Sequence, residues 1–177
     1  MTTILLYGVA AGLTLALACG DSEKEVAAAP PQSAAKRAAR APIDLCGLLT
    51  QAEAEAILGK PIGEPDKGSG STCTYAARAG SGEIMLHVLP LEFGSKAEFH
   101  AFLVKDTEEM NARLKESFKN TGAAPKETAV EPVPEVGSPA YYVDPTLVIL
   151  KDGRVLSILA ADRRQAVGVA AKALPRF

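Results

Sequence analysis

Residues 146–161, TLVILKDGRVLSILAA, give the clearest structural signal in the chain. Two runs of mostly aliphatic residues flank Asp152-Gly153, a dipeptide that tolerates the positive φ angles of a type I′ turn. The pattern predicts a β-hairpin in which Ile149 lies opposite Leu156. Because both runs are apolar at nearly every position, both faces of the hairpin should be covered, one by helices and the other by further protein, a ligand or a partner.

The rest of the domain divides into helices and strands around this hairpin. Three capping motifs, in which Thr, Ser or Asp is followed three residues later by Glu or Gln, predict helices that begin after Thr50, Ser95 and Asp162. Alternating or apolar runs predict further strands at residues 71–78, 83–91 and 139–143, with a short edge strand at 128–133. The order α-β-β-α-β-β-β-α predicts an α+β domain, in which an antiparallel sheet of about five strands packs with three helices on one side.

The N-terminal segment has the features of an export signal. Residues 4–18, ILLYGVAAGLTLALA, are uncharged and too short for a typical spanning helix, which needs about 20 apolar residues. The small residues Ala16 and Ala18 precede Cys19, a pattern typical of cleavage and acylation of the cysteine thiol. We expect residues 1–18 to be a lipoprotein signal peptide. An ordinary cleaved signal and an uncleaved anchor are the alternatives.

A polar linker separates this signal from the domain. Residues 19–42 carry almost no large apolar side chain after the cysteine, which predicts a lipidated Cys19 followed by a disordered tether. Residues 43–177 then form one α+β extracytoplasmic domain of common size. The whole chain has a net charge of −2, aromatic residues make up 5%, and Trp is absent. This composition argues against a nucleic-acid partner, because such binders present a basic face.

Several short motifs resemble a known family. Residues 44–50, DLCGLLT, the Leu58-Gly59 pair and residues 73–75, CTY, resemble the opening of small bacterial lipoproteins, known mainly from actinobacteria, that are classed as a domain of unknown function. Residues 133–142, VPEVGSPAYY, are similar to a later segment of that family, although Glu135 replaces its usual first Gly. The resemblance implies an exported, lipid-anchored α+β domain and implies no known reaction.

The cysteines predict a disulfide. If Cys19 is acylated, Cys46 and Cys73 remain as an even pair in an oxidising compartment, where disulfides form and persist. A metal site is less well supported, because the chain lacks the C-x₂-C spacing and contains only two His. A catalytic thiol lacks an accompanying Cys-His motif.

Other polar residues are weaker candidates for a site. His87 falls in an alternating strand and His100 beside the apolar stripe of a long helix, and each lacks a second convergent group in sequence, so we expect surface or half-buried imidazoles. The Gly/Ser-rich residues 68–71 could cradle an anion but are more typical of a loop. Tyr141 and Tyr142 are adjacent in a predicted strand, so at most one of them can face a given pocket.

The common catalytic and nucleotide-binding motifs do not occur in the sequence. We therefore expect a non-enzymatic lipoprotein of the bacterial cell envelope, held at the membrane by its lipid anchor. It would act without a cofactor or metal as a binding, sensing or assembly module for an envelope ligand or a protein partner. The alternative is an envelope hydrolase or transferase with an unrecognised site.

Overall fold

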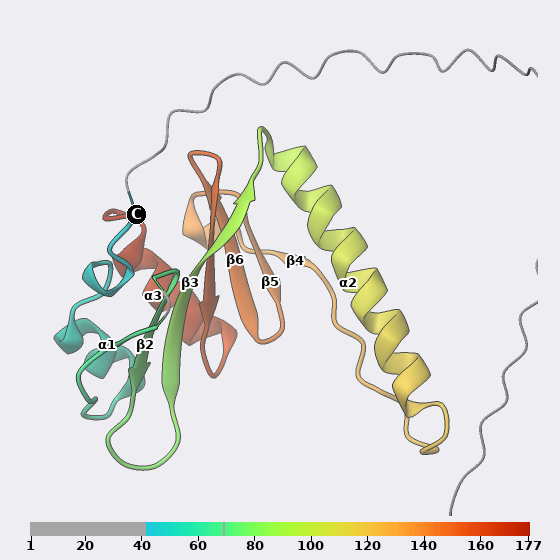
Figure 1. Ribbon diagram of the computed structural model, residues 1–177, viewed down its shortest axis with the longest axis horizontal. Helices are drawn as coiled ribbons and strands as arrows, with labels where there is room; N and C mark the ends of the chain where they lie inside the picture. The colour runs from blue at the N-terminus through green and yellow to red at the C-terminus, as the bar shows by residue number, and fades with distance from the viewer. Residues whose placement is uncertain (1–41, 69) are drawn as a thin grey trace, which may run out of the picture. The chain divides into compact units, whose positions relative to one another are not determined.

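The computed structural model describes residues 42–68 and 70–177 (Figure 1). The predicted signal peptide, the acylated Cys19 and nearly all of the predicted tether lie outside these residues. Among the helices that are described, none combines the length and the apolarity that crossing a bilayer requires.

The described chain is an α+β domain, as predicted, built on one antiparallel sheet with the order β1-β2-β3-β7-β6-β5-β4. The strands, in chain order, are β1 (Asp66–Lys67), β2 (Thr72–Ala76), β3 (Glu83–Glu92), β4 (Glu131–Pro132), β5 (Ala140–Val143), β6 (Thr146–Lys151) and β7 (Arg154–Leu159). The helices are α1 (Gln51–Leu58), α2 (Lys96–Phe118) and α3 (Arg163–Ala173), with 3₁₀ turns η1 (Leu45–Gly47) and η2 (Pro134–Val136).

The sheet has seven strands in the described residues, against about five predicted. The two short edge strands account for the difference: no strand was predicted at β1, and β4 falls within the short edge strand predicted at residues 128–133, which the count of five leaves out. β1 has only two residues, so no alternation of apolar side chains could mark it in the sequence.

The central hairpin has the predicted register. Ile149 lies opposite Leu156, and the turn residues Asp152 and Gly153 have φ angles of 52° and 79°. These positive angles are those of a type I′ turn. Because β7 also pairs with β3, the hairpin joins the two halves of the sheet.

The helices cover both faces of the sheet, which corrects the prediction that they lie on one side. Figure 1 shows α1 and α3 on one side of the sheet and α2 on the other. The first face packs Tyr75, Ile149 and Leu156 against α1, α3 and η1. The second face packs Val148 and Leu150, together with other apolar residues, against the first half of α2. Both faces of the hairpin are apolar, so the second one also needs cover, and the amphipathic α2 supplies it.

The caps of the three helices differ in completeness. Thr50 forms a full reciprocal capping box with Glu53. The side chains of Ser95 and Asp162 accept hydrogen bonds from the backbone N–H groups of the residues three positions later, as expected. The side chains of Glu98 and Gln165 do not bond back to the backbone of Ser95 and Asp162, so these two capping boxes are incomplete. The Glu98 carboxylate accepts from the Gly94 backbone N–H instead, at 2.9 Å.

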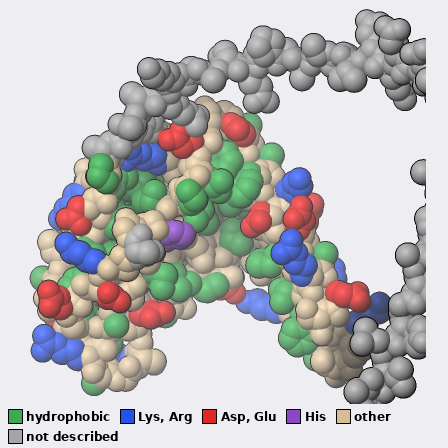
Figure 2. All heavy atoms as spheres, viewed as in Figure 1, with side chains coloured by type: hydrophobic (Ala, Val, Ile, Leu, Met, Phe, Trp, Pro, Cys, Tyr) green, Lys and Arg blue, Asp and Glu red, His purple; other side chains and the backbone are tan. Residues whose placement is uncertain are grey.

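The two halves of α2 differ in packing. Phe99 and Leu103 are buried on the sheet, whereas Met110 and Phe118 are each 38% exposed. Figure 2 shows an open gap between the last turns of α2 and the body of the domain. The Asn111 side chain donates to the Thr128 carbonyl oxygen at 2.8 Å and accepts from the Thr128 backbone N–H at 3.0 Å. The segment that leads from α2 to β4 is therefore attached to the second half of the helix.

Candidate functional site

The cysteine pair lies where the chain enters the domain. The Sγ atoms of Cys46 and Cys73 are 1.93 Å apart and their Cα atoms 5.4 Å apart, which is disulfide distance. Cys46 belongs to η1 and Cys73 to β2, so the pair fastens the first turn of the domain to the sheet.

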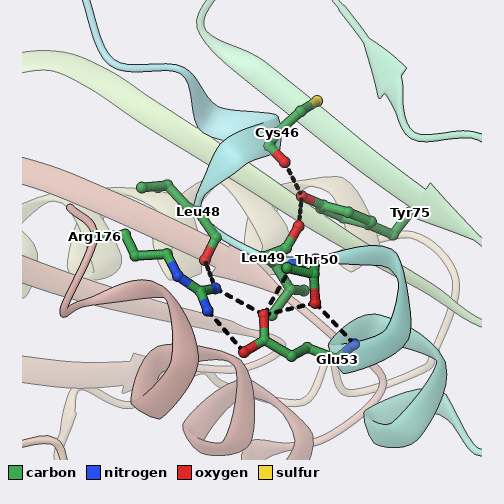
Figure 3. A network of polar contacts seen from close by, with 7 residues as sticks. All are labelled: Cys46, Leu48, Leu49, Thr50, Glu53, Tyr75 and Arg176. Carbon is green, nitrogen blue, oxygen red and sulfur yellow. Dashed lines mark hydrogen bonds and ion pairs between the residues drawn. The ribbon is translucent and has the colours of Figure 1, made fainter.

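The Tyr75 hydroxyl holds the same segment. It lies 2.7 Å from the Leu49 carbonyl oxygen and 3.0 Å from the Cys46 carbonyl oxygen (Figure 3). The ring is fully buried, and burial raises the pKa of the hydroxyl to about 12. Tyr75 therefore remains a neutral hydrogen-bond donor, because ionisation would place a charge in an apolar environment.

An ion pair completes this network. The Arg176 guanidinium contacts both carboxylate oxygens of Glu53, at 2.7 and 2.9 Å, and donates to the Leu48 carbonyl oxygen at 2.9 Å (Figure 3). The hydrogen bonds from Arg176 and from the Thr50 backbone lower the pKa of Glu53 to about 2. We call the Thr50, Glu53, Tyr75 and Arg176 contacts the joint network. It ties the first residues of the domain to the last ones.

The structure does not bring the two histidines into a catalytic arrangement. His87 is half-buried on the α2 side of the sheet, in register with Ser157 and Thr72. His100 is exposed on α2, and its ring stacks on that of Tyr141 with centroids 4.9 Å apart. Within the described chain, no cluster of three or more His, Cys, Asp or Glu side chains could hold a metal ion. Part of the loop at residues 68–71 lies outside the described residues.

Two cavities lined by described residues open on the surface. One, of about 650 Å³, lies where the β2–β3 turn meets the end of β7, and small residues with Glu83 form most of its lining. The other, of about 550 Å³, lies beside the first turn of α2; we call it the α2-start cavity. Its lining comprises Lys96, Pro132, Val133, Pro134, Gly137, Ser138, Pro139, Ala140 and Tyr141.

The α2-start cavity contains polar side chains without partners. Tyr141 is only 5% exposed, and its ring packs against Phe99 with centroids 5.7 Å apart. Across the described residues, its hydroxyl has no hydrogen-bond partner and the Lys96 ammonium has no ion-pair partner. Tyr142 belongs to the core on the opposite face, and its hydroxyl contacts Asp144 at 3.4 Å. Of the two adjacent tyrosines, only Tyr141 therefore faces this cavity.

Sequence reasoning identified part of this site. The pair Tyr141 and Tyr142 was a candidate for lining a pocket, with at most one of them facing it, because adjacent strand residues point to opposite faces. Lys96 was missed, because the sequence around a lysine that follows a capping serine does not show whether its side chain faces a cavity or solvent. Its proximity to β5 depends on how α2 packs against the sheet, and no local pattern records that packing.

Comparisons with models of protein families, with curated proteins and with solved structures found no match to this chain.

Proposed function

We propose that this chain is a lipid-anchored protein of the bacterial envelope and that residues 43–177 form a non-enzymatic binding module. The signal peptide at residues 1–18, acylation at Cys19 and the tether at residues 19–42 are part of the proposal. The observation that carries the binding role is the α2-start cavity, where Lys96 and Tyr141 are available to a ligand.

The perturbed ionisable groups support a structural rather than a catalytic use. Strongly shifted pKa values mark many active sites, but structural ion pairs produce them as well. The two large shifts, at Glu53 and Tyr75, both occur in the joint network. There the Tyr75 hydroxyl contacts backbone carbonyl oxygens and the Glu53 carboxylate contacts Arg176. These interactions hold the fold together.

The position of the joint network fits attachment through the N-terminal end. The cysteine pair, Tyr75 and Arg176 all act on residues 46–53, immediately after the proposed tether. An N-terminally anchored domain benefits from reinforcement at this point, because the first residues of a domain otherwise fray readily.

A thermal-shift screen tests the binding role. The full-length protein in nanodiscs is titrated with envelope lipids, glycans and peptidoglycan fragments, and a saturable rise in Tm without product formation is expected. Ser138→Trp, which fills the α2-start cavity, should abolish the shift, while Ala161→Trp in the other cavity should preserve it. Product formation would favour a hydrolase or transferase instead.

Cell fractionation tests the anchor. Cys19→Ala should move the protein from the membrane fraction to the soluble fraction, because the site of acylation is lost. A variant that stays fully membrane-bound would contradict the lipid anchor and indicate an uncleaved helix.

A further inference from the structure

We infer that the α2-start cavity binds a small amphiphile through an anionic head group, a carboxylate or a phosphate, which contacts the Lys96 ammonium and the Tyr141 hydroxyl. This inference rests on the proposed function, because it names the ligand class of the same cavity. Four features of the cavity carry it.

The first feature is the unpaired hydroxyl of Tyr141. Three tyrosines are described, and the hydroxyls of Tyr75 and Tyr142 both have partners. The Tyr141 hydroxyl has none in the described chain, although the residue is 95% buried. Because Tyr141 lines the cavity and no protein group among the described residues uses its hydroxyl, that hydroxyl is available to hydrogen-bond a ligand there.

The second feature is the location of Lys96. It is the first residue of α2 and lies one turn before His100, whose ring stacks on Tyr141. Residues four apart on a helix project from the same side. Lys96 therefore lies on the side of α2 that faces Tyr141, and one anionic group can contact both side chains.

The third feature is the polarity of the helix start. The N-terminus of a helix carries a partial positive charge and unpaired N–H groups, which favour anions. The carboxylate nearest in sequence, Glu98, lies roughly 200° around the helix from Lys96 and is bonded to the Gly94 backbone N–H. It therefore projects away from the cavity and does not neutralise Lys96 there.

The fourth feature is the apolar wall opposite these groups. Three prolines, Pro132, Pro134 and Pro139, line the cavity together with Val133 and Ala140. Proline has no backbone N–H, so this wall adds few donors and offers rigid apolar surface. A cavity of about 550 Å³ is in the usual range for small ligands. The arrangement therefore suits a charged head at Lys96 and Tyr141 and a hydrocarbon body along the prolines.

Titration with four short probes tests this assignment. The full-length protein in nanodiscs of zwitterionic lipid is titrated with hexanoate, hexyl phosphate, hexanol and inorganic phosphate, and binding is followed by calorimetry. Hexanoate and hexyl phosphate should bind saturably, and hexanol and inorganic phosphate should each bind at least about tenfold more weakly. The relative affinities of hexanoate and hexyl phosphate identify which oxyanion the site prefers.

Matched variants locate the binding. Lys96→Met should weaken hexanoate binding by about tenfold or more, whereas Lys105→Met, a change at an exposed lysine of the same helix, should leave it unchanged. Tyr141→Phe should weaken binding several-fold, and Tyr142→Phe should not. Both tyrosine variants keep the ring, so folding is preserved for the comparison.

The outcomes separate this inference from the proposed function. If hexanol binds as tightly as hexanoate, or if Lys96→Met and Lys105→Met behave alike, the head-group assignment is wrong. In that case, a saturable Tm shift with an envelope fraction that Ser138→Trp abolishes still supports the binding module. If no probe binds and no envelope fraction raises the Tm, both the inference and the proposed function fail.

Discussion

Two buried tyrosines lie on opposite faces of one sheet and differ in what their hydroxyls contact. Tyr75, on the face covered by α1 and α3, lies within hydrogen-bond distance of two backbone carbonyl oxygens. Tyr141, on the face covered by α2, has no hydrogen-bond partner in the described chain. The Tyr75 hydroxyl therefore contributes to the stability of the fold, whereas the Tyr141 hydroxyl has no partner in that part of the chain through which it could do so. The first face thus uses its tyrosine hydroxyl to hold the fold together, and the second carries the hydroxyl to which we assign the proposed binding site.

Replacing one leucine by alanine on each face should give the largest difference in the free energy of unfolding. Leu156 is 0% exposed on the α1 and α3 face, and Leu156→Ala should lower the free energy of unfolding by about 2–5 kcal/mol. Leu159 is on the same strand but half-buried on the α2 face, so Leu159→Ala should cost about 1 kcal/mol. Urea denaturation measures both values. Equal costs would remove the distinction between the faces, and a cost below about 0.5 kcal/mol for both would contradict the fold.

Removal of the cysteine pair should have the next largest effect. With Cys46 and Cys73 separated by 27 positions, closing the loop contributes about 3.5 kcal/mol on the chain-entropy model. The double variant Cys46→Ala/Cys73→Ala should lose an amount near this value, and reduced wild-type protein should lose a similar amount. Non-reducing mass spectrometry of protein from the envelope should find one linked peptide pair. Two free thiols in that material would contradict the disulfide.

The two tyrosines themselves give a more direct comparison. Tyr75→Phe leaves the Leu49 and Cys46 carbonyl oxygens without this donor and should cost about 1–3 kcal/mol. Tyr141→Phe removes a hydroxyl with no partner, so its effect should stay within about 0.5 kcal/mol. Thermal or urea unfolding of both variants provides the measurement. A larger loss for Tyr141→Phe than for Tyr75→Phe would reverse the assignment of the two faces.

Acid titration of stability should show the smallest effect. The pKa of Glu53 in the folded domain is about 2, against an ordinary value of 4.5. Because the folded pKa is depressed, the Glu53–Arg176 contact stabilises the domain fully above about pH 4.5, and this stabilisation is lost as the pH falls towards 2. Glu53→Gln should therefore flatten part of the decline in stability over that interval. An acid profile identical to that of the wild type would mean that the ionised Glu53–Arg176 contact contributes nothing to stability.

Local features of the fold could be predicted from the sequence. The hairpin register follows from Asp152 and Gly153, because a two-residue turn fixes which residues lie opposite each other. Thr50, Ser95 and Asp162 mark the three helix starts because their side chains accept hydrogen bonds from backbone groups only three residues away. Each of these signals involves residues that are close in the chain.

Features that depend on packing between distant segments could not be predicted. The apolar stripe of α2 indicates that the helix packs against something, but it does not indicate which face of the sheet. Arg176 and Glu53 are separated by 123 positions, so no spacing rule connects them. The α2-start cavity likewise forms only when the first turn of α2 meets β5 and η2, and the sequence indicated only that one of Tyr141 and Tyr142 could face a pocket.

The cysteine pair also determines how a mechanical load would travel through the domain. With the two sulfurs bonded, a pull on the chain at Ile43 passes at Cys46 directly into Cys73, and so into β2, which pairs with β3. The covalent shortcut bypasses α1, because the helix lies between the two bonded cysteines in the chain. Glu53 belongs to that bypassed segment, so its contact with Arg176 lies off the covalent path between Cys46 and Cys73. A pull on the N-terminal end of the domain is therefore transmitted first to the sheet, through β2, rather than to α1.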